Sequence, residues 1–568
     1  MLKQFRAFGR SPGWPGRPIL GVQWSQALLA VVDRWFKTHV LELGRELRWS
    51  YLPPLMIYLA AGASELTEIV GTFYVKEYLD VSPAFLAGLA FWVGIPWALK
   101  MPLGHLVDLI WRFKALLVWV GAAVIAASML IMFGLIVEPA RMGAVMEPRT
   151  WFVVSSLIGP VGYALQDVVA DAMTVEAVPR VDTTGQPFSA EAQRLMNTTL
   201  QALGRMADII GGLGVALLNV LIFEGAGPLA QPAKGALYAN VYLLAMTIPL
   251  ISIVGVVLAR ILRWREGLRL RAHGFDEARL RALRQPPGGA ASPDWWILGG
   301  STLFVAIGLV VGLSRSPFGQ ELIFVGSFAV IVLLMAKLMR ALDAEARRTL
   351  LGTSIIVFVF RATPDPGMGQ TWWMIDALGF DAGFMARLSL IGSVLALFGL
   401  LAFRRLIGER SIAYTVGFVT VVGTVLALPV VGMYYGLHEW TAAHTGGFVD
   451  ARFIAVADTA FDSPLSQIAM VPMLAWIANS APARLKATYF AVMSSFSNLA
   501  LSASQLATKY LNQLFEVSRE VRDPLTAQLT TPANYDQLGW LLIITVALGL
   551  LMPFMAIWLT RACGLRCA

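Results

Sequence analysis

Apolar stretches long enough to cross a lipid bilayer recur along this chain, and they constrain its fold more than any other feature. A helix that spans the hydrocarbon core needs roughly 20 mostly apolar residues, and about fourteen windows meet that condition. They are residues 52–76, 83–109, 113–136, 150–174, 198–222, 237–261, 294–313, 320–340, 350–368, 380–403, 411–434, 452–478, 485–512 and 536–560. Charged residues make up only 14% of the chain, where soluble domains carry about 25%. The sequence therefore predicts an all-α polytopic membrane protein.

Lys and Arg residues beside these windows predict the orientation of the chain. Residues 1–50 contain eight basic and three acidic side chains, residues 260–284 repeat that ratio, and residues 435–451 contain no Lys or Arg. Basic loops remain in the cytoplasm, so we expect both termini there and the protein in the plasma (inner) membrane. The net charge of +8 is then accounted for by topology and contact with anionic lipid, without nucleic acid.

The basic loop at residues 262–293 divides the windows into two sets. We expect residues 51–262 to form an N-terminal six-helix bundle and residues 350–568 to form a C-terminal six-helix bundle with a short cytoplasmic tail. Residues 263–349 combine the basic linker with an inserted helix pair. Charges interrupt residues 1–50 too often for a span, so this segment is expected to be an interfacial amphipathic helix.

Two aspartates lie inside the fourth window, in the stretch GYALQDVVADAMTVE. Asp167 is about seven residues, or roughly 10 Å, from the cytoplasmic end of that window. Its i, i+4 spacing aligns it with Asp171 and Tyr163. A carboxylate at the bilayer centre costs about 2.5–3.5 kcal/mol, so we expect Asp167 to face a cavity or the bundle interior and to belong to a functional site.

Arg205 and Asp208 in the fifth window are expected at the depth of Asp167. A network of these three residues carries one excess negative charge, which a proton can neutralise. A static ion pair that joins the fourth and fifth helices is the alternative, and it stays open.

Other ionisable residues interrupt further windows. They are Glu65, Glu68, Lys100, Arg387, Asp458 and Asp462. Because lipid does not solvate charge, each is a candidate for binding solute or protons, with anchoring between helices as the alternative. The spacing of Asp458 and Asp462 repeats that of the pair in the fourth window. Two prolines near Lys100, Pro96 and Pro102, predict a distorted helix whose freed carbonyls line a cavity.

No pattern in the sequence supports an enzyme. The chain contains no G-x-x-x-x-G-K-[ST] loop for direct ATP drive and no H-E-x-x-H or G-x-S-x-G motif in a credible context. Its five histidines show no metal spacing, and its two cysteines lie together at the C-terminus. We therefore expect a protein that is not an enzyme and has neither metal nor cofactor.

The segment GHLVDLIWRFK resembles the cytoplasmic loop between the second and third helices of the major facilitator superfamily, whose pattern is G-x-L-a-D-r-x-G-r-[RK]. The matching residues are Gly104, Asp108, Arg112 and Lys114. This resemblance implies a cytoplasmic gate that closes through charge contacts between helix ends. Asp171 or Glu176 is then the partner of Arg112 or Lys114.

Four segments together resemble the folate-biopterin transporter family within that superfamily. They are PWALKMPLGHLVD, QDVVADA, ATPDPGMGQTWWMIDALGF and ATYFAVMSSFSNLALSASQLATKYL. The family's RR-x-PY after the first of these segments is absent here. The resemblance implies a secondary active transporter with the major facilitator fold, in which two six-helix bundles alternate access to a cavity between them. The inserted helix pair lies between the two bundles in the chain.

The same resemblance implies a folate- or pterin-like organic solute that is moved with protons. A carboxylate such as Glu65 or Asp167 accepts hydrogen bonds from the edge of a pterin ring. A cation such as Lys100 or Arg205 binds the carboxylates of folate.

Three further residues complete the candidate solute site. Trp97 offers a stacking surface, and Gln166 and Asn498 lie in the matching segments. We expect the protein to act as a monomer. Two alternatives stay open, namely a muropeptide permease with the same mechanism and a non-transporting assembly factor for pigment or lipid.

Overall fold

The computed structural model describes residues 47–79, 81–98, 100–182, 186–226, 229, 231–284, 295–313, 318–340, 342–408, 411–480, 486–522 and 529–567. Residues 1–48 separate as a unit of their own, and nearly all of the amphipathic segment expected at residues 1–50 lies outside the described residues. The second unit, Trp49–Ala568, contains the helices of all the predicted spans.

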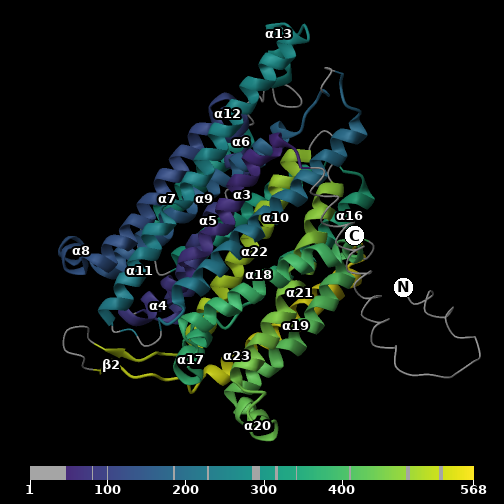
Figure 1. The fold of residues 1–568 in the computed structure, drawn as a ribbon. Coiled ribbons are helices and arrows are strands. Elements are labelled where there is room, and N and C mark those ends of the chain that lie inside the picture. The colour runs from purple at the N-terminus through teal and green to yellow at the C-terminus, as the bar shows by residue number, and fades with distance from the viewer. Residues whose placement is uncertain are drawn as a thin grey trace, which may run out of the picture. The chain divides into compact units, whose positions relative to one another are not determined.

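The first six windows form a helical bundle (Figure 1). Its long helices are α3 (Leu52–Ala63), α4 (Glu68–Tyr78), α5 (Pro83–Ala98), α6 (Lys100–Leu109), α7 (Lys114–Val137), α9 (Pro148–Ala177), α10 (Ala190–Phe223), α11 (Gln231–Ala245) and α12 (Ile248–Ala272). The short helices α8 (Pro139–Val145) and α13 (Glu277–Arg284) lie at its two ends. α3 packs against α9, α10 and α12, and α7 packs against α9 and α11.

The last six windows form a second bundle. Its helices are α16 (Ala344–Arg361), α17 (Met368–Leu378), α18 (Ala382–Gly408), α19 (Ile412–Tyr434), α20 (Leu437–His444), α21 (Ala451–Ser480), α22 (Lys486–Leu514) and α23 (Leu538–Ala562). The inserted pair is α14 (Trp295–Leu313) and α15 (Gly319–Met339). Each predicted window thus contains a helix or a pair of helices, which confirms the predicted fold class. The short antiparallel strands β1 (Val521–Arg522) and β2 (Leu529–Thr531) were not expected.

Several helices begin where a polar side chain caps them. Ser189 accepts a hydrogen bond from the backbone N–H of Ala192 at the start of α10, and Asp343 accepts one from Ala346 at the start of α16. Such caps satisfy backbone N–H groups that have no partner inside the helix.

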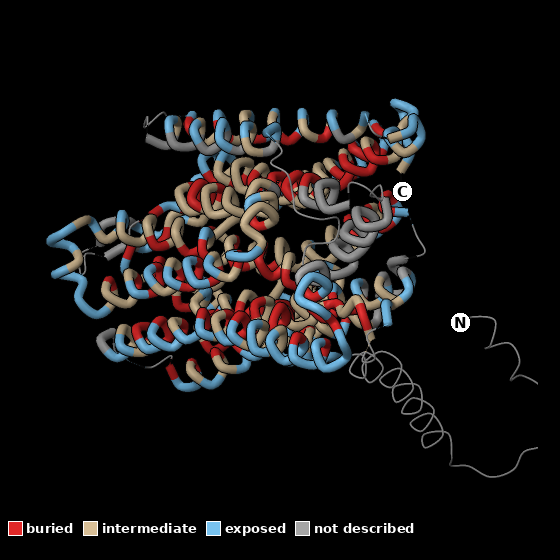
Figure 2. Tube along the Cα trace, turned by 90° about the horizontal axis from the view of Figure 1, so that it is seen from above, coloured by how far each residue is buried: buried red, intermediate tan, exposed pale blue. Residues whose placement is uncertain are grey.

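Within the described residues, nine helical segments are long and apolar enough to span a membrane by themselves. Figure 2 shows buried residues where helices face one another and exposed residues on the outward faces. Large apolar side chains lie on those outward faces, for example Trp558, which is 65% exposed. Apolar side chains on an outward face are stable in contact with lipid. The helical backbone tolerates lipid as well, because helices satisfy their own backbone hydrogen bonds.

The first span is interrupted, which the sequence did not predict. A 3-10 helix, η4 (Ser64–Thr67), separates α3 from α4. Ser and Thr compete for backbone hydrogen bonds and favour such breaks. Before the break, α3 touches α10 through glycines. A Cβ on Gly62 would lie 1.8 Å from the carbonyl oxygen of Asp208, and one on Gly211 would lie 2.2 Å from that of Leu59.

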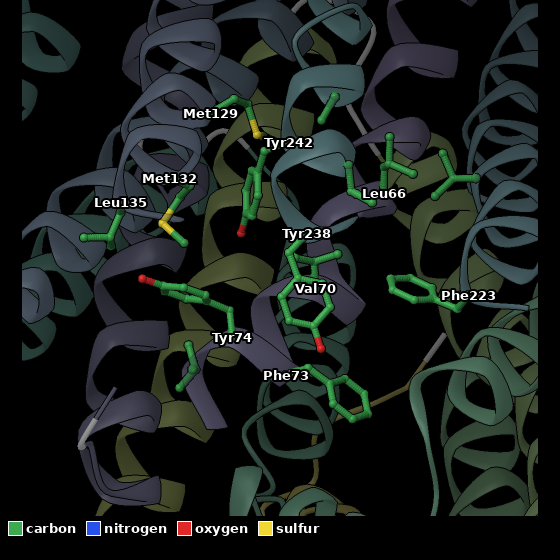
Figure 3. Packing of buried hydrophobic residues seen from close by; sticks show 14 of the residues in the cluster. Leu66, Val70, Phe73, Tyr74, Met129, Met132, Leu135, Phe223, Tyr238 and Tyr242 are labelled. Carbon is green, nitrogen blue, oxygen red and sulfur yellow. The ribbon is translucent and has the colours of Figure 1, made fainter. Parts of the chain in front are cut away.

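An apolar cluster surrounds α4, which follows this break. Figure 3 shows Val70 and Phe73 of α4, Met129 and Met132 of α7, and Tyr242 of α11 in this cluster. All five side chains are buried. The cluster fixes α4 against α7 and α11, so the residues of η4 are held at the edge of a packed core.

The two bundles meet along α5 with α22 and along α10 with α18. They are also joined at the end of the helices that carries α17, here named the α17 end, opposite to the α13 end (Figure 1). There Lys76 Nζ lies 2.5 Å from Asp376 Oδ1, and the Tyr535 hydroxyl donates to Asp376 Oδ2 at 2.6 Å. Burial and the bond to Asp376 raise the pKa of Tyr535, so its hydroxyl remains a donor at neutral pH. Arg519 Nη2 donates to the carbonyl oxygen of Val75 at 3.2 Å.

Candidate functional site

A cluster of charges in the first bundle brings together residues from α6 and α9. Lys100 Nζ lies 2.5 Å from Asp167 Oδ2 and 2.9 Å from Asp171 Oδ2. Lys100 and Asp167 have side chains only 19% and 14% exposed, whereas Asp171 is 39% exposed. The i, i+4 spacing on α9 explains why one ammonium reaches both carboxylates.

Tyr58 of α3 completes this cluster, and the sequence analysis missed it. Its hydroxyl donates to Asp171 Oδ1 at 2.6 Å. The ring packs on Gly204 of α10, where a Cβ would lie only 2.9 Å from Tyr58 Cε2. Tyr58 carries no charge, so it does not stand out among the apolar residues of its window. We name Tyr58, Lys100, Asp167 and Asp171 the α6–α9 charge cluster.

The cation beside Asp167 differs from the one expected. We expected Arg205 to pair with Asp167, but the structure places Lys100 there. Arg205 Nη1 instead lies 2.5 Å from Asp208 Oδ2 on its own helix, α10. Arg205 pairs with Asp208 because side chains three residues apart on one helix lie next to each other. The α6–α9 charge cluster therefore has two carboxylates and one ammonium, and the neighbouring pair is neutral.

Glu65 and Glu68 lie at the interruption of the first span, and both are exposed. Glu65 Oε2 would lie 3.0 Å from a Cβ on Gly212. Arg205, Asp208 and Glu68 are close enough to Glu65 to interact with it electrostatically. The structure thus brings Glu65 near Arg205 and Asp208 of α10, a grouping that the sequence did not predict.

A cavity of about 450 Å³ lies within the first bundle. Its lining includes Ser64, Thr67, Trp97, Tyr163, Asp208 and Tyr242. Trp97 precedes Lys100 by one helical turn and Tyr163 precedes Asp167 by one turn, so the α6–α9 charge cluster lies about one turn from the cavity. The volume is in the range of about 300–1,000 Å³ that small-molecule sites occupy. We expected a cavity between the bundles, whereas the lining residues of this one all come from the first bundle.

Gln166 does not reach the cavity. Its side chain is 2% exposed. It donates to the carbonyl oxygen of Val118 at 3.3 Å and accepts a bond from the Ser252 hydroxyl at 2.8 Å. These bonds occupy both ends of the amide and hold α9 to α7 and α12. Contrary to our expectation, Gln166 joins helices and is not available to a solute in this state.

Asn498 connects the two bundles beside the cavity. Its side-chain amide donates to the carbonyl oxygen of Trp97 at 3.1 Å. A residue of α22 thus contacts the backbone of a cavity-lining residue on α5. The distortion predicted around Lys100 falls on Leu99, which lies outside the described residues.

The residues of the predicted gate lie at the α13 end. Lys114 Nζ is 3.0 Å from Glu176 Oε2, and Arg263 Nη1 is 2.9 Å from Glu176 Oε1. Of the pairings considered from the sequence, this is the one that the structure contains. Arg112 is exposed, and no ion pair joins it to a described residue. Asp108 is half-buried, and a Cβ at Gly104 would meet no atom within 4 Å.

The candidate residues of the second bundle stay apart from the α6–α9 charge cluster. Arg387 on α18 and Asp462 on α21 are exposed, and Asp458 is half-buried. No ion pair links any of the three to another described residue. The two aspartates interact electrostatically with each other.

The chain is similar to membrane transporters in sequence. Residues 61–564 match the model of the BT1 family. A folate-biopterin transporter from Synechocystis sp. is 22% identical over 531 residues, which cover 93% of this chain and 85% of that protein. A putative folate transporter 2 from Plasmodium berghei is 22% identical over 209 residues, which cover 36% of this chain and 42% of that protein.

A solved structure shares the fold. The crystal structure of a POT family transporter in complex with a thioalcohol-conjugated peptide aligns with a TM-score of 0.57. The alignment covers 92% of this chain and 96% of that one at 11% identity. At this identity the likeness concerns the arrangement of helices.

Proposed function

Because this chain belongs to the BT1 family and has the major facilitator fold, we propose that it moves a folate- or pterin-like solute across the membrane together with protons. The family and the fold establish a multi-pass membrane transporter. The names of the two relatives support folate and biopterin as the solute class. Alternating rocking of the two bundles is the mechanism that accompanies this fold.

One observation carries the proposal, namely a charge cluster with an odd carboxylate next to a cavity. Lys100 is shared by Asp167 and Asp171, so one negative charge is left over when both carboxylates are ionised. Two carboxylates that share a site disfavour each other's ionisation. A proton on either aspartate balances the cluster.

Protonation also gives Lys100 a role in binding the solute. When Asp167 takes up a proton, the ammonium loses one of its two counter-charges. An anionic solute group can then replace that counter-charge through a charge-assisted hydrogen bond. Proton and anionic solute thereby bind cooperatively, which is the thermodynamic basis of cotransport.

The cavity supplies the remaining contacts. Trp97 and Tyr163 offer aromatic faces for a flat heterocycle. Asp208 is a lining residue of the cavity, and a carboxylate can accept the paired N–H donors of a pterin ring edge. Arg205 Nη1 lies 2.5 Å from Asp208 Oδ2 and supplies a counter-charge for this carboxylate. This assignment transfers the role of ring acceptor, expected for Glu65 or Asp167, to Asp208.

The orientation follows from the charge distribution. The α13 end contains the basic segment of residues 260–284, and we assign it to the cytoplasm by the positive-inside rule. Lys114, Glu176 and Arg263 then belong to the cytoplasmic gate. Both termini are assigned to the cytoplasm, the protein to the plasma (inner) membrane, and the working unit to a monomer.

Transport into vesicles tests this function. Purified protein is reconstituted, a pH gradient is imposed, and uptake of labelled folate, biopterin and anhydro-muropeptide is compared for wild type and Asp167→Asn. Gradient-driven accumulation of folate or biopterin by wild type alone is the expected result. Accumulation of the muropeptide alone would indicate a muropeptide permease. If no solute accumulates and the two proteins behave alike, the carrier proposal is wrong and an assembly factor becomes the better explanation.

A further inference from the structure

The inserted helix pair lies across the seam between the two bundles. α15 packs against α22 of the second bundle and also contacts α5 of the first, and α14 contacts α6. α5 and α22 are themselves in extensive contact. The pair is therefore positioned to influence how these two helices separate.

A single side chain of α15 bonds to both bundles at the α17 end. Gln320 Nε2 donates to the carbonyl oxygen of Gly88 on α5 at 2.9 Å. Gln320 Oε1 accepts a hydrogen bond from Lys509 Nζ of α22 at 2.8 Å. Both ends of the amide are thus used, one on each bundle.

Glycine at position 88 makes this junction possible. A Cβ on Gly88 would lie 3.1 Å from Gln320 Nε2 and 3.6 Å from Lys509 Cδ. A side chain there would push against the amide nitrogen that donates to the Gly88 carbonyl.

Charge holds α15 to α22 at the same level. Glu321 Oε1 lies 3.0 Å from Lys509 Nζ and also accepts a hydrogen bond from the Tyr510 hydroxyl. Glu321 and Lys509 have side chains 22% and 15% exposed. In such partly buried surroundings an ion pair is screened less than on a protein surface. α15 is therefore fixed to the second bundle, and the bond to Gly88 is a polar attachment to the first.

An apolar joint lies one turn along α15. Ile323 of α15 and Phe91 of α5 are 1% and 0% exposed and form a buried cluster. Leu506 of α22 and Phe324 of α15 pack against it. This joint continues the junction at Gln320 along the same helix.

From these contacts we propose that the pair α14–α15 is a strap that holds the two bundles together at the α17 end through Gln320. The proposal rests on the alternating-access function proposed above. Opening of the α17 end requires α5 to leave α15, which breaks the bond of Gln320 to Gly88 and exposes the Ile323–Phe91 contact. The strap thereby favours the state that is closed at the α17 end.

Distances between spin labels test this role without a transport assay. Labels are attached at Ala140→Cys on α8 and Ala443→Cys on α20, two exposed positions of different bundles near the α17 end. The native cysteines are first replaced through Cys563→Ser and Cys567→Ser. Gln320→Ala is compared with Ser327→Ala, a matched control on α15. Among the described residues, the Ser327 hydroxyl bonds to the Ile323 carbonyl of its own helix and to no other group.

The label–label distance distribution gives the populations of molecules open and closed at the α17 end. Gln320→Ala is expected to increase the ratio of the open to the closed population about fivefold to tenfold, the effect of losing roughly one net hydrogen bond. Ser327→Ala is expected to leave the ratio unchanged. Gly88→Ala provides a second variant that disturbs the same junction from α5 and is expected to act in the same direction. A ratio unchanged in both Gln320→Ala and Gly88→Ala would overturn the strap.

The same labels separate this proposal from the proposed function. Wild-type protein is measured with and without saturating folate. Distances that do not respond to folate would count against the folate carrier, while the strap is judged only by the difference between Gln320→Ala and Ser327→Ala in solute-free protein.

Discussion

Lys100 Nζ lies 2.5 Å from Asp167 Oδ2, and the same ammonium lies 2.9 Å from Asp171. The three side chains come from two helices of one bundle, beside a cavity of about 450 Å³. Their charges do not cancel. A permanent structural ion pair needs only one carboxylate for each cation, and in the proposed function the second carboxylate is the one that binds a proton.

Removal of the cation tests the energetics of this cluster. Lys100→Gln leaves two carboxylates without a counter-charge; the cost is below the about 3–5 kcal/mol of a fully buried pair, because the Asp171 side chain is 39% exposed and partly screened by solvent. We expect a marked fall in the unfolding temperature of the purified protein in detergent. Adding Asp171→Asn to Lys100→Gln is expected to restore more than half of the loss. If Lys100→Gln unfolds at the same temperature as wild type, the Lys100 ammonium does not stabilise the two carboxylates.

Tyr58 positions Asp171, and two variants remove that support differently. Tyr58→Phe deletes a hydrogen bond to a charged group, worth about 1.5–3 kcal/mol. Gly204→Ala leaves the hydroxyl in place but puts a methyl group 2.9 Å from the Tyr58 ring. Both variants are expected to lower folate uptake in vesicles. Normal uptake by both would remove Tyr58 from the site.

The close crossing of α3 and α10 predicts a contrast between two glycines of one helix. A Cβ on Gly211 would lie 2.2 Å from the Leu59 carbonyl oxygen, whereas one on Gly214 would meet nothing within 4 Å. Gly211→Ala is expected to destabilise the protein by about 1–3 kcal/mol or more through overpacking. Gly214→Ala is expected to be neutral or stabilising by up to about 1 kcal/mol, because Ala is the better helix former. Equal unfolding temperatures for the two variants would contradict the described crossing.

The ion pair at the α17 end predicts a rescue by charge reversal. Lys76→Glu places two carboxylates in contact across the two bundles, so we expect uptake to fall by about tenfold, which corresponds to roughly 1.4 kcal/mol. The double variant Lys76→Glu with Asp376→Lys restores opposite charges and is expected to recover most of the uptake. A double variant as impaired as Lys76→Glu alone would mean that the pair does not join the bundles during transport.

Much of the fold was predictable from the sequence because the bilayer imposes a length on each span. Window 83–109 coincides with the span formed by α5 and α6, and window 411–434 differs from α19 by one residue. The break at Ser64–Thr67 was not predicted, because hydropathy averaged over window 52–76 does not locate a single turn of 3-10 helix. The β1–β2 hairpin is too short to give a periodic signal.

The candidate site was predicted less completely than the fold. Asp167 and Lys100 were both candidates because each is an ionisable residue inside an apolar window, where lipid does not solvate its charge. The depth of a residue along its helix did not identify the partner of Asp167, because depth does not determine how each helix is rotated about its axis. Gln166 illustrates the same limit: its type suggested solute binding, and its neighbours on α7 and α12 give it a packing role.

The central claim is that the odd carboxylate of the α6–α9 charge cluster couples solute movement to protons. The most direct test is the proton dependence of folate movement in proteoliposomes that contain wild type or Asp167→Asn. We predict that wild type accumulates folate against its gradient when the pH gradient is imposed, whereas Asp167→Asn exchanges folate across the membrane but does not accumulate it. Equal gradient-driven accumulation by the two proteins would contradict the account.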